Sequence, residues 1–157
     1  MMVLFYLEPC CGKGAISRVL EEYGYKVQSS DISTKDNIYG EKGIDAFLIN
    51  KLNDNIITNT PYNRSILNDL VEHFSIIYIK KMALLLRLTF LESDEIRELC
   101  ASLPLKVVYI FSSRITMYPE NDDKPKNKGT TAYAWFVWEK GYVGNTILNW
   151  IYDKECK

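Results

Sequence analysis

Two glycines, Gly12 and Gly14, lie one residue apart between a short apolar run and a segment with helical spacing. A loop of this kind lets the backbone pass close to a ligand. A dinucleotide-binding fingerprint would need a third glycine at position 17, where this chain has Ser17. The phosphate-binding pattern GxxxxGK followed by Ser or Thr is also absent. The loop is therefore neither of the common pyrophosphate cradles, although a simple helix cap would also explain the two glycines.

Two carboxylates lie near this loop in the sequence. Glu8 precedes Gly12 by four residues, and Asp31 follows it by nineteen, at the end of a predicted strand. A carboxylate beside the loop would repel a pyrophosphate but suits a cationic ligand. An acid at the end of the second strand accepts hydrogen bonds from a ribose diol. A ligand with a ribose, an adenine and a positive centre meets these conditions, and S-adenosylmethionine is such a ligand.

A second candidate is the tetrapeptide formed by Asn59, Thr60, Pro61 and Tyr62, which follows a β-branched run. In doubly wound sheets, the carboxyl ends of the strands form the ligand-binding edge. Asn59 offers an amide oxygen, and the proline pushes Thr60 into an extended conformation that can turn its carbonyl outward. Tyr62 offers a flat face. Two acceptors and an aromatic ring suit an exocyclic amine on a planar ring, while an ordinary turn is the alternative.

The two motifs together resemble those of the class I S-adenosylmethionine-dependent methyltransferases that act on amino groups. The likeness is greatest to adenine-specific DNA methyltransferases of small phage-associated type, whose motifs are EPxxGxG and D/N-P-P-Y/F. This chain has EPCCGKG at 8–14 and NTPY at 59–62, in the same order. Thr60 replaces the first proline, which we expect to weaken the rigidity of the motif without removing the backbone carbonyl.

The resemblance implies roles for particular residues. Asn59, Thr60, Pro61 and Tyr62 would form the catalytic motif, with Tyr62 stacked on an extruded base. Asp31 would bind the ribose, and Asp45 would contact the adenine amine of the cofactor. The full set of expected cofactor contacts is Glu8, Pro9, Cys10, Gly12, Gly14, Asp31, Ile32, Asp45, Ala46, Phe47 and Asn59.

The elements that must position these residues follow from the apolar spacing. A strand at 3–7, a helix from Ala15 to the glycine at 24 and a strand at 25–31 form a βαβ unit, which implies a parallel pair. We expect a loop at 33–43, a strand at 55–59, a helix at 65–74, a buried strand at 82–86 and a helix from Ser93. Two strands at 105–117 and 130–142, joined by a polar loop at 119–129, predict an antiparallel hairpin, and the tail at 145–153 predicts a short helix.

The predicted fold class is therefore α/β. It is a Rossmann-like, mostly parallel sheet with helices on both faces and a C-terminal antiparallel hairpin. We expect residues 1–157 to form a single domain, without a separate target-recognition domain. With 47% apolar residues, a net charge of -1 and no long apolar run, the composition is that of a globular protein with no membrane span, and we expect it in the cytoplasm. The spacing of the cysteines and of His73 matches no metal site.

The sequence constrains the identity of the substrate least. The resemblance implies DNA adenine, with weak phosphate contacts expected from Arg114, Lys124, Lys126 and Lys128, although neighbouring acids offset these charges. RNA adenine and the side-chain amide of protein glutamine remain alternatives, because each presents a similar amino group. A non-catalytic subunit of a methylase complex is a further alternative. A homo-oligomer or a partner subunit would then supply target recognition.

Overall fold

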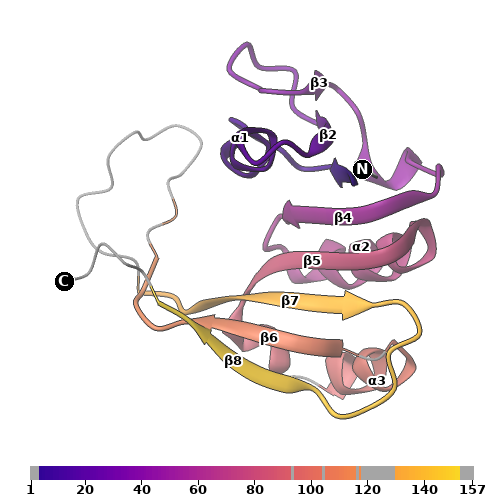
Figure 1. The fold of residues 1–157 in the computed structure, drawn as a ribbon, viewed down its shortest axis with the longest axis vertical. Helices are drawn as coiled ribbons and strands as arrows, with labels where there is room; N and C mark the ends of the chain where they lie inside the picture. The colour runs from indigo at the N-terminus through magenta and orange to yellow at the C-terminus, as the bar shows by residue number, and fades with distance from the viewer. Residues whose placement is uncertain (1–3, 93, 104, 116, 118–129, 153–157) are drawn as a thin grey trace.

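The structure is a computed structural model that describes residues 4–92, 94–103, 105–115, 117 and 130–152 (Figure 1). The strands are β1 (Phe5–Glu8), β2 (Lys26–Asp31), β3 (Glu41–Lys42), β4 (Asn53–Asn59), β5 (Tyr78–Arg87), β6 (Leu105–Phe111), β7 (Tyr133–Glu139) and β8 (Ile147–Ile151). The α-helices are α1 (Ala15–Glu22), α2 (Arg64–Ile77) and α3 (Asp94–Ser102), and two 3-10 helices are η1 (Ala46–Leu48) and η2 (Leu88–Leu91).

The eight strands form one sheet in the order β3-β2-β1-β4-β5-β7-β6-β8. β7 is antiparallel to both of its neighbours, β5 and β6, and the other neighbouring strands are parallel. The predicted fold class, a mostly parallel α/β sheet with an antiparallel hairpin near its C-terminal end, is confirmed. The predicted βαβ unit is present as β1, α1 and β2.

The helices lie on both faces of the sheet but cover them unequally. The connection from β1 to β2 and the connection from β4 to β5 run in opposite directions along the sheet, so right-handed crossovers place α1 and α2 on opposite faces. Figure 1 shows α2 and α3 behind the sheet. In α1, by contrast, Ser17 is the buried residue, and the other side chains of this helix are exposed or half-buried.

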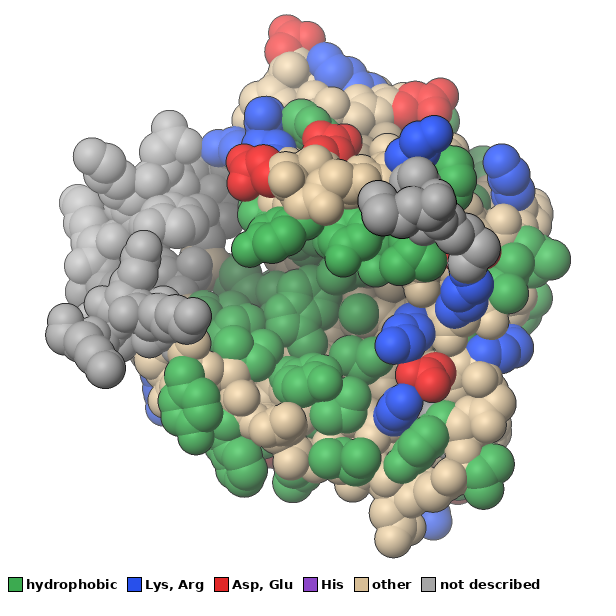
Figure 2. All heavy atoms as spheres, in the orientation of Figure 1, with side chains coloured by type: hydrophobic (Ala, Val, Ile, Leu, Met, Phe, Trp, Pro, Cys, Tyr) green, Lys and Arg blue, Asp and Glu red, His purple; other side chains and the backbone are tan. Residues whose placement is uncertain are grey.

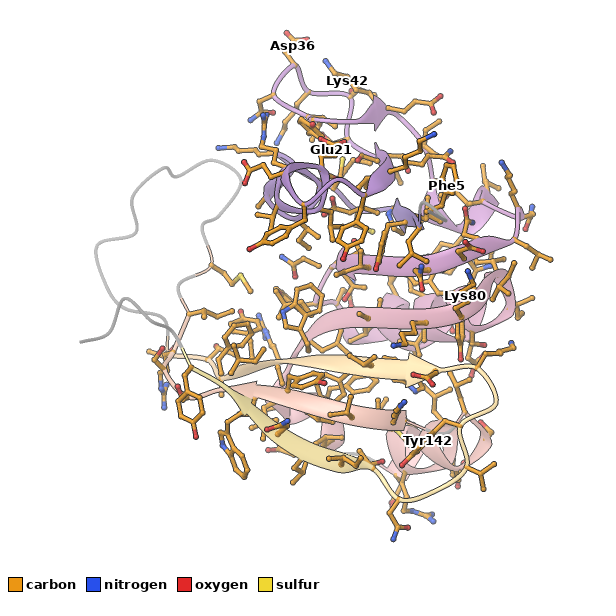
Figure 3. All side chains as sticks on the ribbon, viewed as in Figure 1. Phe5, Glu21, Asp36, Lys42, Lys80 and Tyr142 are labelled. Carbon is orange, nitrogen blue, oxygen red and sulfur yellow. The ribbon has the colours of Figure 1, made fainter. Side chains whose placement is uncertain are left out.

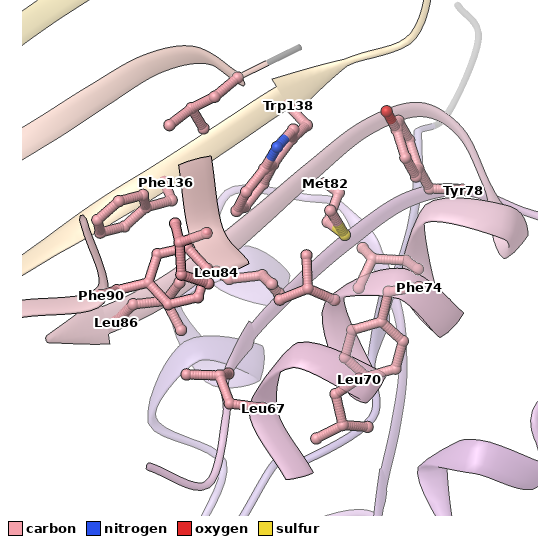
Figure 4. Close-up of a cluster of buried hydrophobic side chains, with 14 of the residues drawn as sticks. Leu67, Leu70, Phe74, Tyr78, Met82, Leu84, Leu86, Phe90, Phe136 and Trp138 are labelled. Carbon is pink, nitrogen blue, oxygen red and sulfur yellow. The ribbon is translucent and has the colours of Figure 1, made fainter. Parts of the chain in front are cut away.

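The hydrophobic core lies on the face covered by α2 and α3 (Figure 4). Helix α2 contributes Leu70 and Phe74, which pack against alternate residues of the central strands. These strand residues include Met82, Leu84, Leu86, Phe136 and Trp138. Because side chains alternate along a strand, the intervening residues point to the opposite face.

That opposite face is apolar and largely uncovered over the C-terminal strands. Ala83 is paired with Val137, and Trp135 with Tyr109, and all four side chains are half-buried. Figure 2 shows a hollowed surface of hydrophobic side chains on the side toward the viewer, with Lys, Arg and acidic residues along its margin. The sheet thus packs one face against the helices of the hydrophobic core and leaves part of its other face exposed to solvent.

Several predicted elements differ from the structure. The predicted loop at 33–43 contains β3, which pairs with the end of β2, and the predicted helix at 65–74 continues to Ile77. The predicted helix in the tail is wrong, because residues 147–151 form β8 instead. The edge of β6 offers this segment a parallel partner, and β-branched residues at 147 and 151 favour an extended chain. The polar loop at 119–129 lies outside the described residues. In the part of the chain that the structure describes, no helix is long and apolar enough to cross a membrane.

Candidate active site

The carboxyl ends of β1, β2 and β4 lie side by side at one edge of the sheet. Phe5 and Lys80, at the amino-terminal ends of β1 and β5, mark the opposite edge (Figure 3). The glycine loop follows β1, Asp31 is the last residue of β2, and Asn59 is the last residue of β4. The topology therefore brings the two predicted motifs and Asp31 to the same edge, where ligands bind in sheets of this kind.

Asp31 connects the two loops at this edge. Its Oδ2 accepts a hydrogen bond of 2.9 Å from the backbone N–H of Gly12, and its Oδ1 accepts one of 2.9 Å from the N–H of Ser33. The backbone N–H of Cys11 donates to the carbonyl of Ser30 at 2.9 Å. Asp31 thus fixes the glycine loop against β2, and each carboxylate oxygen keeps a further lone pair for a ligand hydroxyl.

The loop requires glycine at positions 12 and 14 for different structural reasons. Gly12 has φ +49°, and a Cβ added there would meet no atom within 4 Å, so open space lies beside it. Gly14 has φ +80°, and a Cβ there would lie 2.3 Å from the Cγ of Tyr39. Gly14 therefore lets Tyr39 pack on the loop, whereas Gly12 leaves a surface that a ligand can approach.

Glu8 is buried behind the loop. It is 1% exposed, and the hydroxyl of Ser17 in α1 donates a hydrogen bond to its carboxylate. The Ser17 hydroxyl also lies 2.5 Å from the hydroxyl of Ser29 in β2. Burial raises the pKa of Glu8 to about 7, the nearby Asp31 adds to this rise, and the bond from Ser17 opposes it. The expected position of Glu8 beside a cationic ligand stays a prediction, and the structure shows that one partner of its carboxylate is Ser17 of α1.

The other residues expected around the cofactor occupy several environments. Pro9 is buried and Cys10 half-buried, and burial raises the pKa of the Cys10 thiol to about 12, so this thiol stays protonated near neutral pH. The carbonyl of Cys10 accepts a bond of 3.4 Å from the hydroxyl of Thr58 in β4. Ile32 is 67% exposed beyond the end of β2. Cys10 packs against the hydrophobic core, and its expected contact with the cofactor stays a prediction.

Asp45 caps the short helix η1. Its side chain accepts a bond of 3.0 Å from the backbone N–H of Phe47, while Ala46 is buried. The ring of Phe47 lies 5.7 Å from the ring of His73, whose Nε2 is 3.0 Å from the carbonyl of Ile49. The contacts of His73 with η1 hold the segment 45–49 against α2.

The catalytic motif predicted from sequence lies between β4 and α2. Asn59 is half-buried, and its Oδ1 accepts a hydrogen bond from the hydroxyl of Tyr62. Thr60 is 2% exposed, and its hydroxyl has no hydrogen-bond partner among the described residues. Pro61 is exposed. Asn63 then caps α2 by accepting a bond of 3.1 Å from the N–H of Ser65, which fixes where the helix starts.

Two residues that sequence reasoning missed flank Tyr62. The guanidinium of Arg87, at the end of β5, lies 5.2 Å from the centre of the Tyr62 ring, and the ring of Tyr133 lies 5.3 Å away on β7. Arg87 and Tyr133 are cross-strand partners in the sheet. The sequence signal for Arg87 was its position as the first charged residue after the apolar run at 82–86. The signal for Tyr133 required knowledge of which strand pairs with β5.

A cavity of about 230 Å³ opens beside Tyr62. Its wall is formed by α2, η2 and α3 together with the end of β5, and the polar residues that line it are Tyr62, Asn68, Arg87, Thr89 and Glu95. A second, more acidic hollow adjoins it, lined by Asp69, Glu72, Glu95 and Glu98 among others. The predicted phosphate contact Arg114 is exposed beyond the end of β6, and Lys124, Lys126 and Lys128 lie outside the described residues.

No protein-family model and no curated protein sequence matches this chain. Solved structures do match it. Magnesium protoporphyrin IX methyltransferase (ChlM) from Synechocystis PCC 6803 with bound SAM aligns with a TM-score of 0.64 and 14% identity over 87% of this chain and 70% of that one. The chain has the class I methyltransferase fold.

Two further methyltransferase-fold structures give the same result. TehB from Haemophilus influenzae aligns with a TM-score of 0.60 and 15% identity over 89% of this chain. A SAM-dependent O-methyltransferase from Thermotoga maritima aligns with a TM-score of 0.56 and 13% identity over 90% of this chain. This chain spans 58% of the length of TehB and 61% of the length of the Thermotoga protein. At such low identity, these likenesses establish the fold and leave the acceptor open.

Proposed function

We propose that this chain transfers a methyl group from S-adenosylmethionine to the exocyclic amine of adenine in DNA. The observation that carries the proposal is the placement of Asn59 and Tyr62 at the end of β4, on the same sheet edge as the glycine loop and Asp31. A cofactor site and a site for a planar amine acceptor would then be neighbours.

The residues at this edge fit the cofactor. Gly12 offers an open backbone surface, and Asp31 keeps acceptor capacity for a ribose diol beside it. Asp45 follows β3, and the N–H of its neighbour Ile44 donates to the carbonyl of Asp31 at 3.0 Å, so Asp45 lies close to the ribose acceptor, where an adenine amine would be bound. Phe47 packs against His73 of α2. The two ChlM structures, whose names include bound SAM and bound SAH, add support through the shared fold.

The chemistry that the bound cofactor supplies is an electrophilic methyl group on a sulfonium. The chain supplies position and charge. The lone pair of an aromatic amine is delocalised into its ring, so the amine is a weak nucleophile until hydrogen-bond acceptors draw its N–H groups out of the ring plane. The amide oxygen of Asn59 and the carbonyl of Thr60 are the acceptors for these two N–H groups. The Tyr62 ring supports the face of the base.

The structure adds one condition to this mechanism. The hydroxyl of Tyr62 already donates to the Asn59 Oδ1, which is the acceptor that the amine needs. The Tyr62 hydroxyl thus takes one of the two lone pairs of this oxygen, so the amine must use the other or displace the hydroxyl. Burial raises the pKa of Tyr62, so its hydroxyl remains a proton donor throughout the physiological range. The amine and the Tyr62 hydroxyl therefore share or compete for the same acceptor oxygen.

One observation favours a second acceptor class. The acidic hollow next to the cavity, with Asp69, Glu72 and Glu98, would repel a phosphate backbone that ran across α2 and α3. The side-chain amide of a protein glutamine presents an NH2 group without phosphates. A protein glutamine acceptor is therefore the second candidate, and RNA adenine differs from the first only in its sugar.

The deciding experiment offers DNA, RNA and protein separately to the purified chain with methyl-labelled cofactor. We expect label in DNA adenine, with the product identified by digestion to nucleosides. The matched variant is Asn59→Ala, which should keep cofactor affinity and lose roughly 10²–10³-fold in transfer rate, because it removes one preorganised electrostatic contact. A fully active Asn59→Ala protein would place the active site elsewhere. Label in protein alone would replace adenine by glutamine as the acceptor.

A further inference from the structure

The guanidinium of Arg87 lies beside the candidate active site and has no role in the proposed methyl transfer. Arg87 ends β5 at the same edge as Asn59, and its side chain is exposed on the wall of the 230 Å³ cavity. It lies over the face of Tyr62, 5.2 Å from the ring centre. No hydrogen bond or ion pair joins Arg87 to any residue that the structure describes. Among the described residues, nothing therefore takes up its donors, which face the cavity mouth where a ligand could bind.

The chemistry of guanidinium limits what that ligand can be. Its N–H groups form a planar fork that matches the oxygens of a phosphate or carboxylate. In the cavity wall, Asn68 and Thr89 add neutral polar groups, and Glu95 adds a negative charge. The acids of the adjoining hollow, Asp69, Glu72 and Glu98, lie on the α2 and α3 side, whereas Arg87 lies on the β5 side next to Tyr62. The cavity thus has its positive end at the acceptor motif.

We propose that Arg87 binds a phosphate group adjoining the acceptor base, so that the acceptor is a nucleotide within a nucleic acid rather than a free base or an amide. This inference rests on the proposed function, because it takes the group at Asn59 and Tyr62 to be the methyl acceptor. The phosphate next to the base is held by Arg87, and the rest of the strand leaves away from the acidic hollow.

A binding experiment tests Arg87 without any need for catalysis. Deoxyadenosine 5′-monophosphate, deoxyadenosine 3′-monophosphate and phosphate-free deoxyadenosine are titrated separately into the full chain at millimolar concentration and followed by NMR chemical shifts. One of the two monophosphates should bind about threefold to fivefold more tightly than deoxyadenosine, as expected for an exposed ion pair. Arg87→Gln should remove this difference, and Arg87→Lys should restore part of it.

Two variants control for charge alone. Arg97→Gln removes an exposed arginine of α3 that is already paired with Asp94 and Glu98, and it should leave the preference for the monophosphate unchanged. Glu95→Gln removes the acid of the cavity wall and should increase that preference. A thermal melt of each variant checks that it is folded. Equal binding of all three probes, absence of binding by both monophosphates, or a preference that survives in Arg87→Gln would overturn the proposal.

Methyl transfer is measured in parallel on a short single-stranded oligonucleotide with one adenine. Arg87→Gln should raise KM for the oligonucleotide, leave kcat and cofactor affinity unchanged, and lower the slope of log KM against log salt by about 0.7, as for one lost phosphate contact. An unchanged KM and salt slope in an active enzyme would overturn the role of Arg87 and leave the proposed function standing. Conversely, a wild-type chain that methylates no nucleic acid would overturn the proposed function, and the monophosphate titration would still decide whether Arg87 binds phosphate.

Discussion

Glu8→Gln should change how the stability of the protein depends on pH. Glu8 is 1% exposed and accepts a hydrogen bond from the Ser17 hydroxyl. Burial raises its pKa from an ordinary value of 4.5 to about 7. The folded protein therefore binds the Glu8 proton more tightly than the unfolded chain does. The stability that this provides is fully present below pH 4.5 and is lost as the pH rises through 7.

The size of the effect follows from the difference between the two pKa values. A carboxyl group with a pKa near 7 when folded and 4.5 when unfolded contributes about 3 kcal/mol to the change in unfolding free energy across that range. Glutamine has nearly the same shape, can accept from Ser17 and carries no ionisable proton. The free energy of unfolding of Glu8→Gln, relative to wild type, should therefore rise by about 3 kcal/mol between pH 4.5 and pH 8.

Urea unfolding followed by tryptophan fluorescence, at closely spaced pH values, measures this difference. Glu22→Gln is the matched control, since it removes an exposed carboxylate from α1, the helix that carries Ser17. If the stability difference between Glu8→Gln and wild type stays constant with pH, Glu8 is not a protonated, buried carboxyl group. The raised pKa of Glu8, and burial as its cause, would then be refuted.

Two further changes test the motifs directly. Tyr62→Phe removes the hydroxyl that occupies Asn59 and keeps the ring, so KM for the acceptor should fall about threefold to tenfold, as expected for one net hydrogen bond, with kcat unchanged. A rise in KM, measured by steady-state methyl transfer, would show instead that the hydroxyl positions Asn59. Gly14→Ala should destabilise the protein by about 2–4 kcal/mol, because a Cβ there meets Tyr39 at a positive φ, and thermal unfolding measures it. Gly24→Ala, at φ +83° with open space beside it, should cost only about 1 kcal/mol, and equal losses at both positions would remove Tyr39 from the explanation.

The site residues that can be predicted from the sequence are those whose position depends only on where a strand ends. Gly12, Asp31 and Asn59 each end or follow a strand, and parallel strands bring such positions to one edge. The direction of Glu8 was not predictable, because it depends on how α1 packs and on the two serines that meet its carboxylate. The same holds for Arg87, whose neighbours come from the loop after β4 and from β7.

The tail shows the same limit for the fold. Residues 147–151 have no periodicity that separates a short helix from an edge strand, and the choice is made by the free side of β6. The order of β7 and β6 in the sheet is also non-local, because β7 follows β6 in the chain and yet lies between β6 and β5. The elements that were not predicted from the sequence therefore depend on pairing between strands that are far apart along the chain.

The insertion of β7 between β5 and β6 has a consequence for the order in which the protein is made. As the ribosome synthesises the chain, β5 can pair with β4, but β6 and the other side of β5 cannot reach β7 until residues 133–139 have followed. Until then, the side of β5 that will pair with β7 lacks its native partner, and Tyr133 has not yet joined Tyr62 and Arg87. Tyr62 and Arg87 can meet before β7 is made, but the Tyr133 ring joins them only after residues 133–139 have been synthesised.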